Sequence, residues 1–529
     1  MTLLDQRSTD EVVAEVAPVV DRLRRLTGIG EDGPELLPLD AGEQYRFSFA
    51  MDACVGCHSC EAACAEQNAT PVDGAWRRVG ELEGGVFPLT KRLNLSMACN
   101  HCLEPTCLSG CPTEAYTKLQ NGVVRHDAAE CIGCQYCIWN CPYEVPVYDK
   151  AAKVVAKCDM CLPRLEQGQS PACVLACPTH AITVEPVNVA AWRADYTEAE
   201  APGLPPASIT LSTTRLVLPA GLASGPELVP ATDHSIQPED PHWPLVALTL
   251  LTQLSLGTVA ATVVAELAGG AGRSGLAGGA VGAAIAGAVA LGASLFHLGR
   301  PTHAFKALRN LRTSWLSREV ALLSLFSGAS LAYAAAWMWA EGSGAGRALR
   351  LVLGVGAVAA GLAGIYASGR LYLVPARPVW NSRRTLVAFF ATALSTGPLL
   401  ALLCLDRSRI AAGVVLALMA AAAAGALAQL GVQAQLVRTL RARSDRQHRG
   451  TAQLLEKRFR GLQMARPTAA VTTLALLAWT LDSPLAGTQA GGRIATALFL
   501  AALGELAGRY LFYVTVVPYR VAGSFFSGR

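Results

Sequence analysis

The sequence predicts two parts of different fold class: an α+β domain rich in cysteine, followed by an all-α bundle of eight transmembrane helices. Sixteen of the seventeen cysteines lie between Cys54 and Cys177, and almost all the long apolar runs lie after residue 242. With 529 residues, 52% of them hydrophobic and 16% charged, the chain is too long for one domain and too apolar for an ordinary soluble protein. The net charge of +4 is too small to indicate a nucleic-acid partner.

The cysteines fall into four groups of four. One group reads Cys131-x2-Cys134-x2-Cys137-x3-Cys141-Pro142, which is the ligand spacing of bacterial ferredoxins, where the fourth cysteine binds the other cluster of a pair. The other groups keep this pattern with a longer gap or without the proline: Cys54, Cys57, Cys60 and Cys64; Cys99, Cys102, Cys107 and Cys111; Cys158, Cys161, Cys173 and Cys177. We therefore expect an α+β ferredoxin-like domain over residues 46–185, with these sixteen cysteines as the iron ligands of four [4Fe–4S] clusters.

Structural zinc and disulfides are the alternative explanations of clustered cysteines. A zinc site has no use for a third cysteine three residues after a CxxC pair, so the spacing favours iron–sulfur clusters. If the groups pair as in two-cluster ferredoxins, each cluster takes three thiolates from one group and one from its partner. We expect the inner groups to pair and the outer groups to pair, although spacing alone leaves the pairing open. The expected ligand sets are Cys99, Cys102, Cys107 with Cys141; Cys131, Cys134, Cys137 with Cys111; Cys54, Cys57, Cys60 with Cys177; and Cys158, Cys161, Cys173 with Cys64.

Eight apolar runs follow, each near the length of about 20 residues that crosses a bilayer. They span residues 243–267, 275–298, 320–340, 351–373, 386–405, 410–436, 467–483 and 494–517. A buried core helix is an alternative for the short seventh run. We expect an eight-helix membrane anchor over residues 243–520, whose even number of crossings places both its ends on one side.

Basic residues predict which side that is. Counted over the loops, twenty Lys and Arg lie on the side of the cysteine-rich domain and six on the far side. The positive-inside rule then places this domain in the cytoplasm and the helices in the inner membrane. The alternative is that the basic loops are docking surfaces for the cysteine-rich domain itself.

Two further segments lie outside these domains. Residues 1–45 contain no secretory signal, and apolar residues at helical spacing between residues 9 and 26 predict a helical N-terminal extension. The proline-rich residues 186–242 predict an extended connector that contains one strand at 209–218 and that a partner orders.

Ionisable residues near a membrane are candidates for function because their burial in lipid is costly. His297 ends the second apolar run and Glu319 precedes the third, so we expect both at the membrane surface beside the clusters. There a His–carboxylate pair could accept the two protons that a quinol releases with its electrons. The alternatives are a carbonyl-bonded interfacial histidine and a helix-capping glutamate. Glu505 and Arg509, four residues apart, are expected to form a structural ion pair.

The cysteine-rich half resembles the iron–sulfur subunit of the dimethyl sulfoxide reductase family of molybdopterin enzymes. The residues that carry the resemblance are Cys99-Asn-His-Cys102, Cys107-x3-Cys111-Pro112, the group from Cys131 to Tyr143, and Lys157-Cys158-Asp159-x-Cys161. The second half is similar to the eight-helix membrane anchor of the same complexes. Its matching residues are His242-Trp243-Pro244-Leu245, His297-Leu298-Gly299-Arg300-Pro301, Ser317-Arg318-Glu319 and Gly504-Glu505-Leu506-x-Gly508-Arg509. In the family these are two chains, whereas here they are fused.

The resemblance implies a separate catalytic subunit with a molybdenum or tungsten bis-pterin cofactor. The clusters would connect it to a site for menaquinone or ubiquinone in the anchor, where the family's quinol-side histidine matches His297. Some nitrate reductase relatives carry Trp where Cys102 stands, so its thiolate implies four four-iron clusters here. The expected cytoplasmic side differs from that of exported dimethyl sulfoxide reductases and fits sulfite dehydrogenase-like relatives better. A redox-linked ion transporter and a plain membrane tether are the alternative functions.

Overall fold

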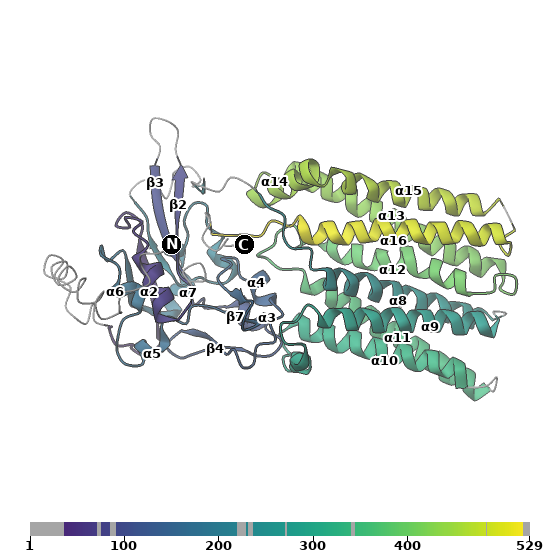
Figure 1. The fold of residues 1–529 in the computed structure, drawn as a ribbon, viewed down its shortest axis with the longest axis horizontal. Helices are drawn as coiled ribbons and strands as arrows, with labels where there is room; N and C mark the ends of the chain where they lie inside the picture. The colour runs from purple at the N-terminus through teal and green to yellow at the C-terminus, as the bar shows by residue number, and fades with distance from the viewer. Residues whose placement is uncertain are drawn as a thin grey trace, which may run out of the picture.

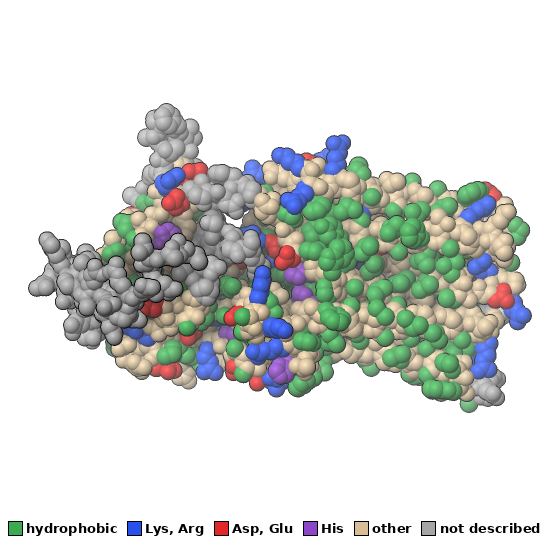
Figure 2. Space-filling view, in the orientation of Figure 1, with side chains coloured by type: hydrophobic (Ala, Val, Ile, Leu, Met, Phe, Trp, Pro, Cys, Tyr) green, Lys and Arg blue, Asp and Glu red, His purple; other side chains and the backbone are tan. Residues whose placement is uncertain are grey.

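The computed structural model describes residues 36–70, 76–84, 91–219, 229–230, 236–269, 272–339, 344–482 and 484–521. The helix expected between residues 9 and 26 lies outside the described residues. Figure 1 shows the cysteine-rich domain at one end of a long bundle of parallel and antiparallel helices. Figure 2 shows hydrophobic side chains over much of the bundle's flank, with charged side chains gathered at its ends and at the junction with the cysteine-rich domain.

The cysteine-rich domain contains small sheets joined by short helices. Strand β1 is the centre of a three-stranded sheet of order β8-β1-β9, in which β8 is antiparallel and β9 parallel to it. A second sheet has the order β10-β2-β3, and two hairpins complete the set. The strands are β1 (Glu43–Ala50), β2 (Arg78–Gly84), β3 (Lys91–Met97), β4 (Tyr116–Lys118), β5 (Val124–His126), β6 (Val147–Asp149), β7 (Val154–Ala156), β8 (Ile182–Asn188), β9 (Arg215–Val217) and β10 (Val229–Pro230). Because β1 begins at Glu43, part of the expected N-terminal extension belongs to this domain.

A short helix begins at or near the third cysteine of each group. The helices α3 and α4 each end at the residue before the group's fourth cysteine, which turns out of the helix with extended backbone. This local geometry separates the fourth thiol from the other three, as the ligand exchange between groups requires. The short helices are α2 (Ser59–Gln67), α3 (Thr106–Gly110), α4 (Tyr136–Asn140), α5 (Leu162–Leu165) and α6 (Ala172–Leu175).

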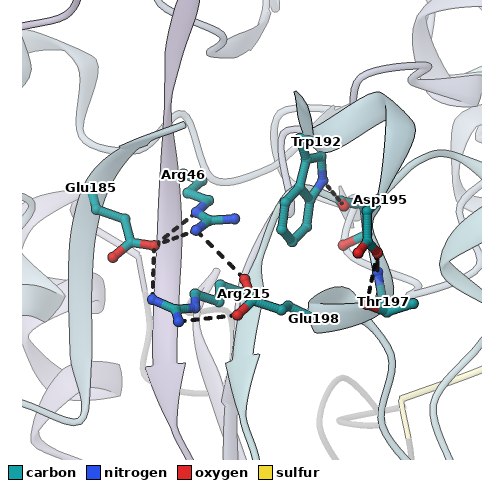
Figure 3. A network of polar contacts seen from close by, with 8 residues as sticks. Arg46, Glu185, Trp192, Asp195, Thr197, Glu198 and Arg215 are labelled. Atoms are coloured by element: carbon teal, nitrogen blue, oxygen red, sulfur yellow. Dashed lines mark hydrogen bonds and ion pairs between the residues drawn. The ribbon is translucent and has the colours of Figure 1, made fainter. Parts of the chain in front are cut away.

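The structure differs from the expected extended connector over residues 186–242. Its first part folds back onto the cysteine-rich domain as α7 (Val189–Ala194), η2 (Thr197–Ala199), η3 (Ala207–Ile209) and β9. The indole of Trp192 is buried and donates a hydrogen bond to the Ser212 carbonyl over 2.9 Å. Figure 3 shows the adjoining ion pairs, in which Arg46 and Arg215 approach Glu185 to 2.7 and 3.7 Å. One buried aromatic ring and these ion pairs give the segment a core that its proline content does not suggest.

Among the described residues, eight long helices form the bundle. They are α8 (Trp243–Ala268), α9 (Arg273–Leu295), α10 (Trp315–Trp339), α11 (Gly344–Leu371), α12 (Arg383–Cys404), α13 (Ala412–Ala442), α15 (Arg460–Thr480) and α16 (Thr488–Val514). Seven of these, all except α15, are long and apolar enough to cross a membrane within the described part of the chain. The first turns of α15 carry Arg460, Gln463 and Arg466, which lower its hydropathy, yet it runs beside α16 and α13. The remaining short elements are η4 (Pro301–Leu308), α14 (Arg446–Gln453) and the π-helix η5 (Leu454–Arg458).

Small residues allow the helices to approach closely. A Cβ atom at Gly257 of α8 would lie 2.0 Å from the Ala393 carbonyl oxygen of α12, and one at Gly397 would meet the backbone of Gly257 at 2.3 Å. Helices in lipid usually pack through such contact between backbones. Lipid is itself apolar, so the burial of apolar side chains between helices contributes little free energy.

Candidate functional site

The sixteen cysteines of the four groups are free of disulfides. Thiols from two different groups surround one small cavity of about 30 Å³: those of Cys99, Cys102, Cys107 and Cys141. Four convergent thiols around a buried space are the donor set of a [4Fe–4S] cluster. The residues therefore fit the implied cofactor at this position.

The pKa values of other thiols indicate which cysteines are neighbours elsewhere in the domain. Burial raises the pKa of Cys137 well above its ordinary value, and three neighbouring thiolates raise it further, those of Cys134, Cys111 and Cys131. Burial likewise raises the pKa of Cys158, with further contributions from Cys99, Cys64, Cys161 and Cys173. Burial also raises the pKa of Cys54, as do Cys177 and Cys57. A thiol with a raised pKa stays protonated at neutral pH unless a metal centre binds its sulfur and displaces the proton.

We number the four expected ligand sets by their order from the free end of the domain to the membrane. The first site is Cys54, Cys57, Cys60 and Cys177; the second is Cys158, Cys161, Cys173 and Cys64; the third is Cys99, Cys102, Cys107 and Cys141; the fourth is Cys131, Cys134, Cys137 and Cys111. The thiolate of Cys173 contributes to the raised pKa of Cys60, and that of Cys99 to the raised pKa of Cys158. The second site therefore adjoins both the first and the third. Cys57 of the first site is exposed.

Backbone amides also donate to the sulfur atoms. The Gly133 N–H donates to Cys131 Sγ over 3.4 Å, and the Met160 N–H donates to Cys158 Sγ over 3.3 Å. Both donors lie two residues after the first cysteine of a CxxC pair, where the backbone turns through positive φ at Gly133 and Met160. Such hydrogen bonds stabilise a thiolate and tune the potential of a cluster it holds.

The fourth site is bound directly to the membrane domain. His297 Nε2 lies 3.2 Å from the Cys134 carbonyl oxygen, and the Gly299 N–H donates to the Gly133 carbonyl over 3.4 Å. A Cβ atom at Gly133 would lie 2.4 Å from the Lys153 carbonyl oxygen and 2.9 Å from Gly299 Cα. Only glycine permits this approach, because Gly133 also has a φ of +70°.

A cavity of about 380 Å³ lies at this junction between the cysteine-rich domain and helices α8 to α11. Its wall includes Cys134 of the fourth site together with His297 and Glu319, so the structure brings both predicted residues to one place. Most of the remaining lining is apolar: Ile132, Leu245, Leu248, Leu291, Leu295, Leu298, Phe305, Leu308, Leu316, Val320, Leu323 and Leu371 among others. The volume and lining are those of a site for an apolar ligand with a polar head.

Glu319 differs from its expected position at a helix start. Helix α10 begins at Trp315, so Glu319 lies inside its second turn and is only 4% exposed. Its Oε1 atom is buried and has no hydrogen-bond partner among the described residues. Buried polar atoms are nearly always satisfied, so this oxygen marks a place where a polar ligand atom would be stabilised.

His297 is held as a neutral ring. Burial lowers its pKa to about 4, and the neighbouring His242 lowers it further. Because a carbonyl oxygen only accepts hydrogen bonds, Nε2 is the atom that carries the proton toward Cys134, which leaves Nδ1 as the basic nitrogen. The ring is therefore carbonyl-bonded and also lines the cavity.

Trp139 is the part of this junction that the sequence analysis missed. It lies on α4, between Cys137 and Cys141, and is 6% exposed. Its ring centroid lies 5.1 Å from that of His242 and 6.2 Å from that of His297. It also belongs to the apolar core formed by the bundle. The only indication in the sequence was that an aromatic residue lies between two predicted ligands, Cys137 and Cys141.

The expected ion pair between Glu505 and Arg509 is not formed. The Glu505 carboxylate instead accepts hydrogen bonds from Thr392 and Gln429, over 2.7 and 2.9 Å, and Arg509 donates to Gln253 over 2.8 Å. The four-residue spacing would permit an ion pair, but polar side chains of α8, α12 and α13 form hydrogen bonds with the two charged groups instead.

Family comparisons agree with this division of the chain. Residues 91–186 match the model of a 4Fe–4S dicluster domain, and residues 239–514 match that of the DMSO reductase anchor subunit (DmsC). The chain belongs to the DMSO reductase anchor family. It is an iron–sulfur electron-transfer subunit fused to a membrane anchor of that family. The group from Cys54 to Cys64 lies outside the matched dicluster segment.

Relatives of the chain are subunits of known reductases and dehydrogenases. One chain of the anaerobic dimethyl sulfoxide reductase of Haemophilus influenzae is 38% identical over 32% of this protein and 86% of the relative's own length. The corresponding chain of the Escherichia coli reductase is 35% identical over 27% and 75%, respectively. One subunit of the sulfite dehydrogenase of Allochromatium vinosum is 39% identical over 26% of this protein and 67% of the relative's own length.

Proposed function

We propose that this chain carries electrons through four [4Fe–4S] clusters between the membrane quinone pool and a separate catalytic subunit that holds a molybdopterin cofactor. The observation that carries the proposal is the cavity at the junction, whose wall contains Cys134 beside His297 and Glu319. An electron leaving a quinone there has a predicted cluster ligand in direct reach. The relatives' names support dimethyl sulfoxide or sulfite chemistry in the partner.

The four sites would each hold one cluster through three thiolates of one group and one of another. The third site supports this assignment best, because its four thiols enclose one cavity. The clusters supply one-electron steps. In this assignment their ligands form a row from the exposed Cys57 to the membrane junction.

At the quinone end, the chain's own residues would handle protons. Quinol oxidation releases two protons with two electrons. His297 and Glu319 both line the cavity, and Nδ1 of the neutral His297 and the unsatisfied Oε1 of Glu319 would be the acceptors. The wall that α9, η4 and α10 contribute is mostly apolar and would shield a quinone ring from water.

We also propose that the cluster domain faces the cytoplasm and that α15 crosses the membrane as an eighth span. Arg300 and Lys306 contact carbonyl oxygens of the cluster domain, and Lys306 and Arg309 pair with Glu130. These basic residues therefore hold the cluster domain against the bundle, in addition to any part they have in setting the orientation of the chain in the membrane. The nine basic residues between positions 438 and 466 still support the orientation. A reporter enzyme active only in the periplasm, fused to the C-terminus, should be inactive; activity would contradict this side.

The test of function uses the full chain alone. Its clusters are reduced with dithionite, a soluble quinone is added, and reoxidation is followed by absorbance. His297→Ala and Glu319→Gln should slow reoxidation by about 10²-fold or more, the usual value of a positioned proton donor or acceptor. His303→Ala is the matched control, because His303 is close in the chain and does not line the cavity. Wild-type rates in both variants would point to a plain tether.

One buried carboxylate favours a second candidate, redox-linked proton transport. Glu505 lies in α16 and is held by uncharged donors, Thr392, Ser395 and Gln429. Carboxylates inside membranes often belong to proton relays. If Glu505→Gln abolishes quinone-dependent proton release in vesicles while cluster reoxidation continues, transport is supported; unchanged release leaves Glu505 structural.

A further inference from the structure

Two cationic side chains are buried among the cysteines. Arg77 is 2% exposed and Lys157 is 4% exposed. Buried Lys and Arg are almost always paired with carboxylates. Neither residue forms an ion pair with a carboxylate among the described residues, so the compensating negative charge must come from another group.

Arg77 points part of its guanidinium at the first and second sites. Its Nη1 donates to Ser96 Oγ over 3.2 Å, and the same hydroxyl lies 3.4 Å from Cys60 Sγ. Its Nε and Nη2 atoms are buried without a hydrogen-bond partner in the part of the chain that the structure describes. Burial lowers the pKa of Arg77, but the thiolates around it outweigh burial and raise it: those of Cys173, Cys60, Cys158 and Cys64. These cysteines come from both sites.

Lys157 has the equivalent place between the second and third sites. Its ammonium group donates to Cys99 Sγ over 3.6 Å and to the Cys158 carbonyl over 2.7 Å, and it also contacts the Val124 carbonyl. Burial lowers its pKa, while the thiolates of Cys99, Cys107 and Cys158 raise it by more. One ammonium therefore adjoins a ligand of each site.

The interval between the third and fourth sites holds a neutral residue instead. Tyr116 is 5% exposed and lies beside thiols of both sites. Burial raises its pKa, and the neighbouring thiolates, including those of Cys137 and Cys107, raise it further. The cations thus occupy two of the three intervals along the row.

We propose that Arg77 and Lys157 raise the reduction potentials of the clusters on either side of them and so set the potential profile of the row. The inference rests on the proposed four-cluster function. When a cluster accepts one electron, its negative charge increases by one and no bond changes. A fixed cation stabilises the reduced form more than the oxidised form, and the interaction is strong where water is excluded.

The profile follows from the placement. The second cluster adjoins both buried cations, the first and third adjoin one of them each, and the fourth adjoins neither. Lys118, which donates to the Cys102 carbonyl over 2.6 Å, adds a partly exposed cation beside the third. We therefore expect Arg77 and Lys157 together to favour the electron on the second cluster, and the fourth cluster to respond to neither residue.

The experiment is a redox titration of the purified full chain, followed by electron paramagnetic resonance. Arg77→Met should lower the reduced-to-oxidised ratio of the first and second clusters at least tenfold at a fixed potential, which is 59 mV for a one-electron couple. Lys157→Met should do the same to the second and third clusters. The charge-retaining Arg77→Lys and Lys157→Arg should stay close to wild type. Arg92→Met, at a side chain that is 66% exposed, is the matched control.

The outcomes separate this inference from the function it rests on. A wild-type chain with fewer than four clusters refutes the four-cluster function. Four clusters whose potentials stay unchanged in the Met variants refute the present inference alone. If the Met variants lose the adjacent clusters while Arg77→Lys and Lys157→Arg keep them, the charge is required and the proposal stands. If the charge-retaining variants lose them as well, the residues act through packing and the proposal fails.

Discussion

Replacing Trp139 with alanine should weaken the contact between the cluster domain and the membrane bundle. The ring is 6% exposed and packs against five aromatic or imidazole rings of the bundle, those of His242, His297, Tyr372, Trp380 and Tyr513. A buried Trp removes about 150–250 Å² from water, worth roughly 4–6 kcal/mol at about 25 cal/mol per Å². Core Trp→Ala changes typically cost about 3–5 kcal/mol. We expect a loss in this lower range, because the side chains around the cavity beside Trp139 can partly relax into the space that the ring leaves.

Hydrogen exchange measures this loss at the junction itself. The Gly299 and Arg300 N–H groups donate across the junction to Gly133 and Ile132, so they exchange when the domains separate. A loss of about 3–5 kcal/mol raises the open population roughly a hundred- to a few thousand-fold, and exchange should accelerate accordingly. Trp243→Ala is the control, because Trp243 is 54% exposed. Unchanged exchange at Gly299 and Arg300 in a Trp139→Ala chain that keeps its clusters would refute the reasoning.

Three other substitutions test separate parts of the structure. Gly133→Ala should destabilise the junction by more than the roughly 1–2 kcal/mol of left-handed strain, since its Cβ would meet the Lys153 carbonyl; equal thermal stability to wild type would contradict this. Trp192→Ala should expose residues 189–217 to proteolysis at a cost of about 3–5 kcal/mol, and a protected segment would show that the ion pairs of Figure 3 suffice. Cys141→Ser should remove the resonance signal of the third cluster and retain that of the fourth, whereas loss of the fourth would disprove the exchange of ligands between groups.

Local sequence patterns predicted those helices whose structure depends on the local sequence alone. Apolar runs located the long helices, because each must satisfy its backbone within lipid. The ferredoxin spacing predicted that the fourth cysteine is set apart from the other three, and Cys141 does turn out of α4 with extended backbone. Helix α15 has the length of a membrane span, but Arg460 and Arg466 in its first two turns lower its hydropathy. Length alone was therefore not enough to identify it as a span.

The junction between the domains was less predictable, because it depends on contacts between distant residues. Gly133 and Gly299 each lie in a motif that the sequence analysis quoted, but only their mutual approach explains why both are glycine. The folded part of the connector depends on the buried apolar cluster around Trp192 and on the adjoining ion pairs. His297 and Glu319 could be selected as ionisable residues at the membrane surface, but their common cavity required the tertiary structure.

A quinone analogue that cannot be reduced provides the most direct test of the central proposal, that the row of clusters ends at the junction cavity. The analogue is added to the reduced full chain, and the resonance spectrum is compared with that of Cys134→Ser, which lacks a ligand of the fourth site. We expect the analogue to perturb one cluster signal, the one that Cys134→Ser removes, and Glu319→Gln to weaken that effect. A perturbation of any other cluster, or of none, would contradict the proposed quinone site.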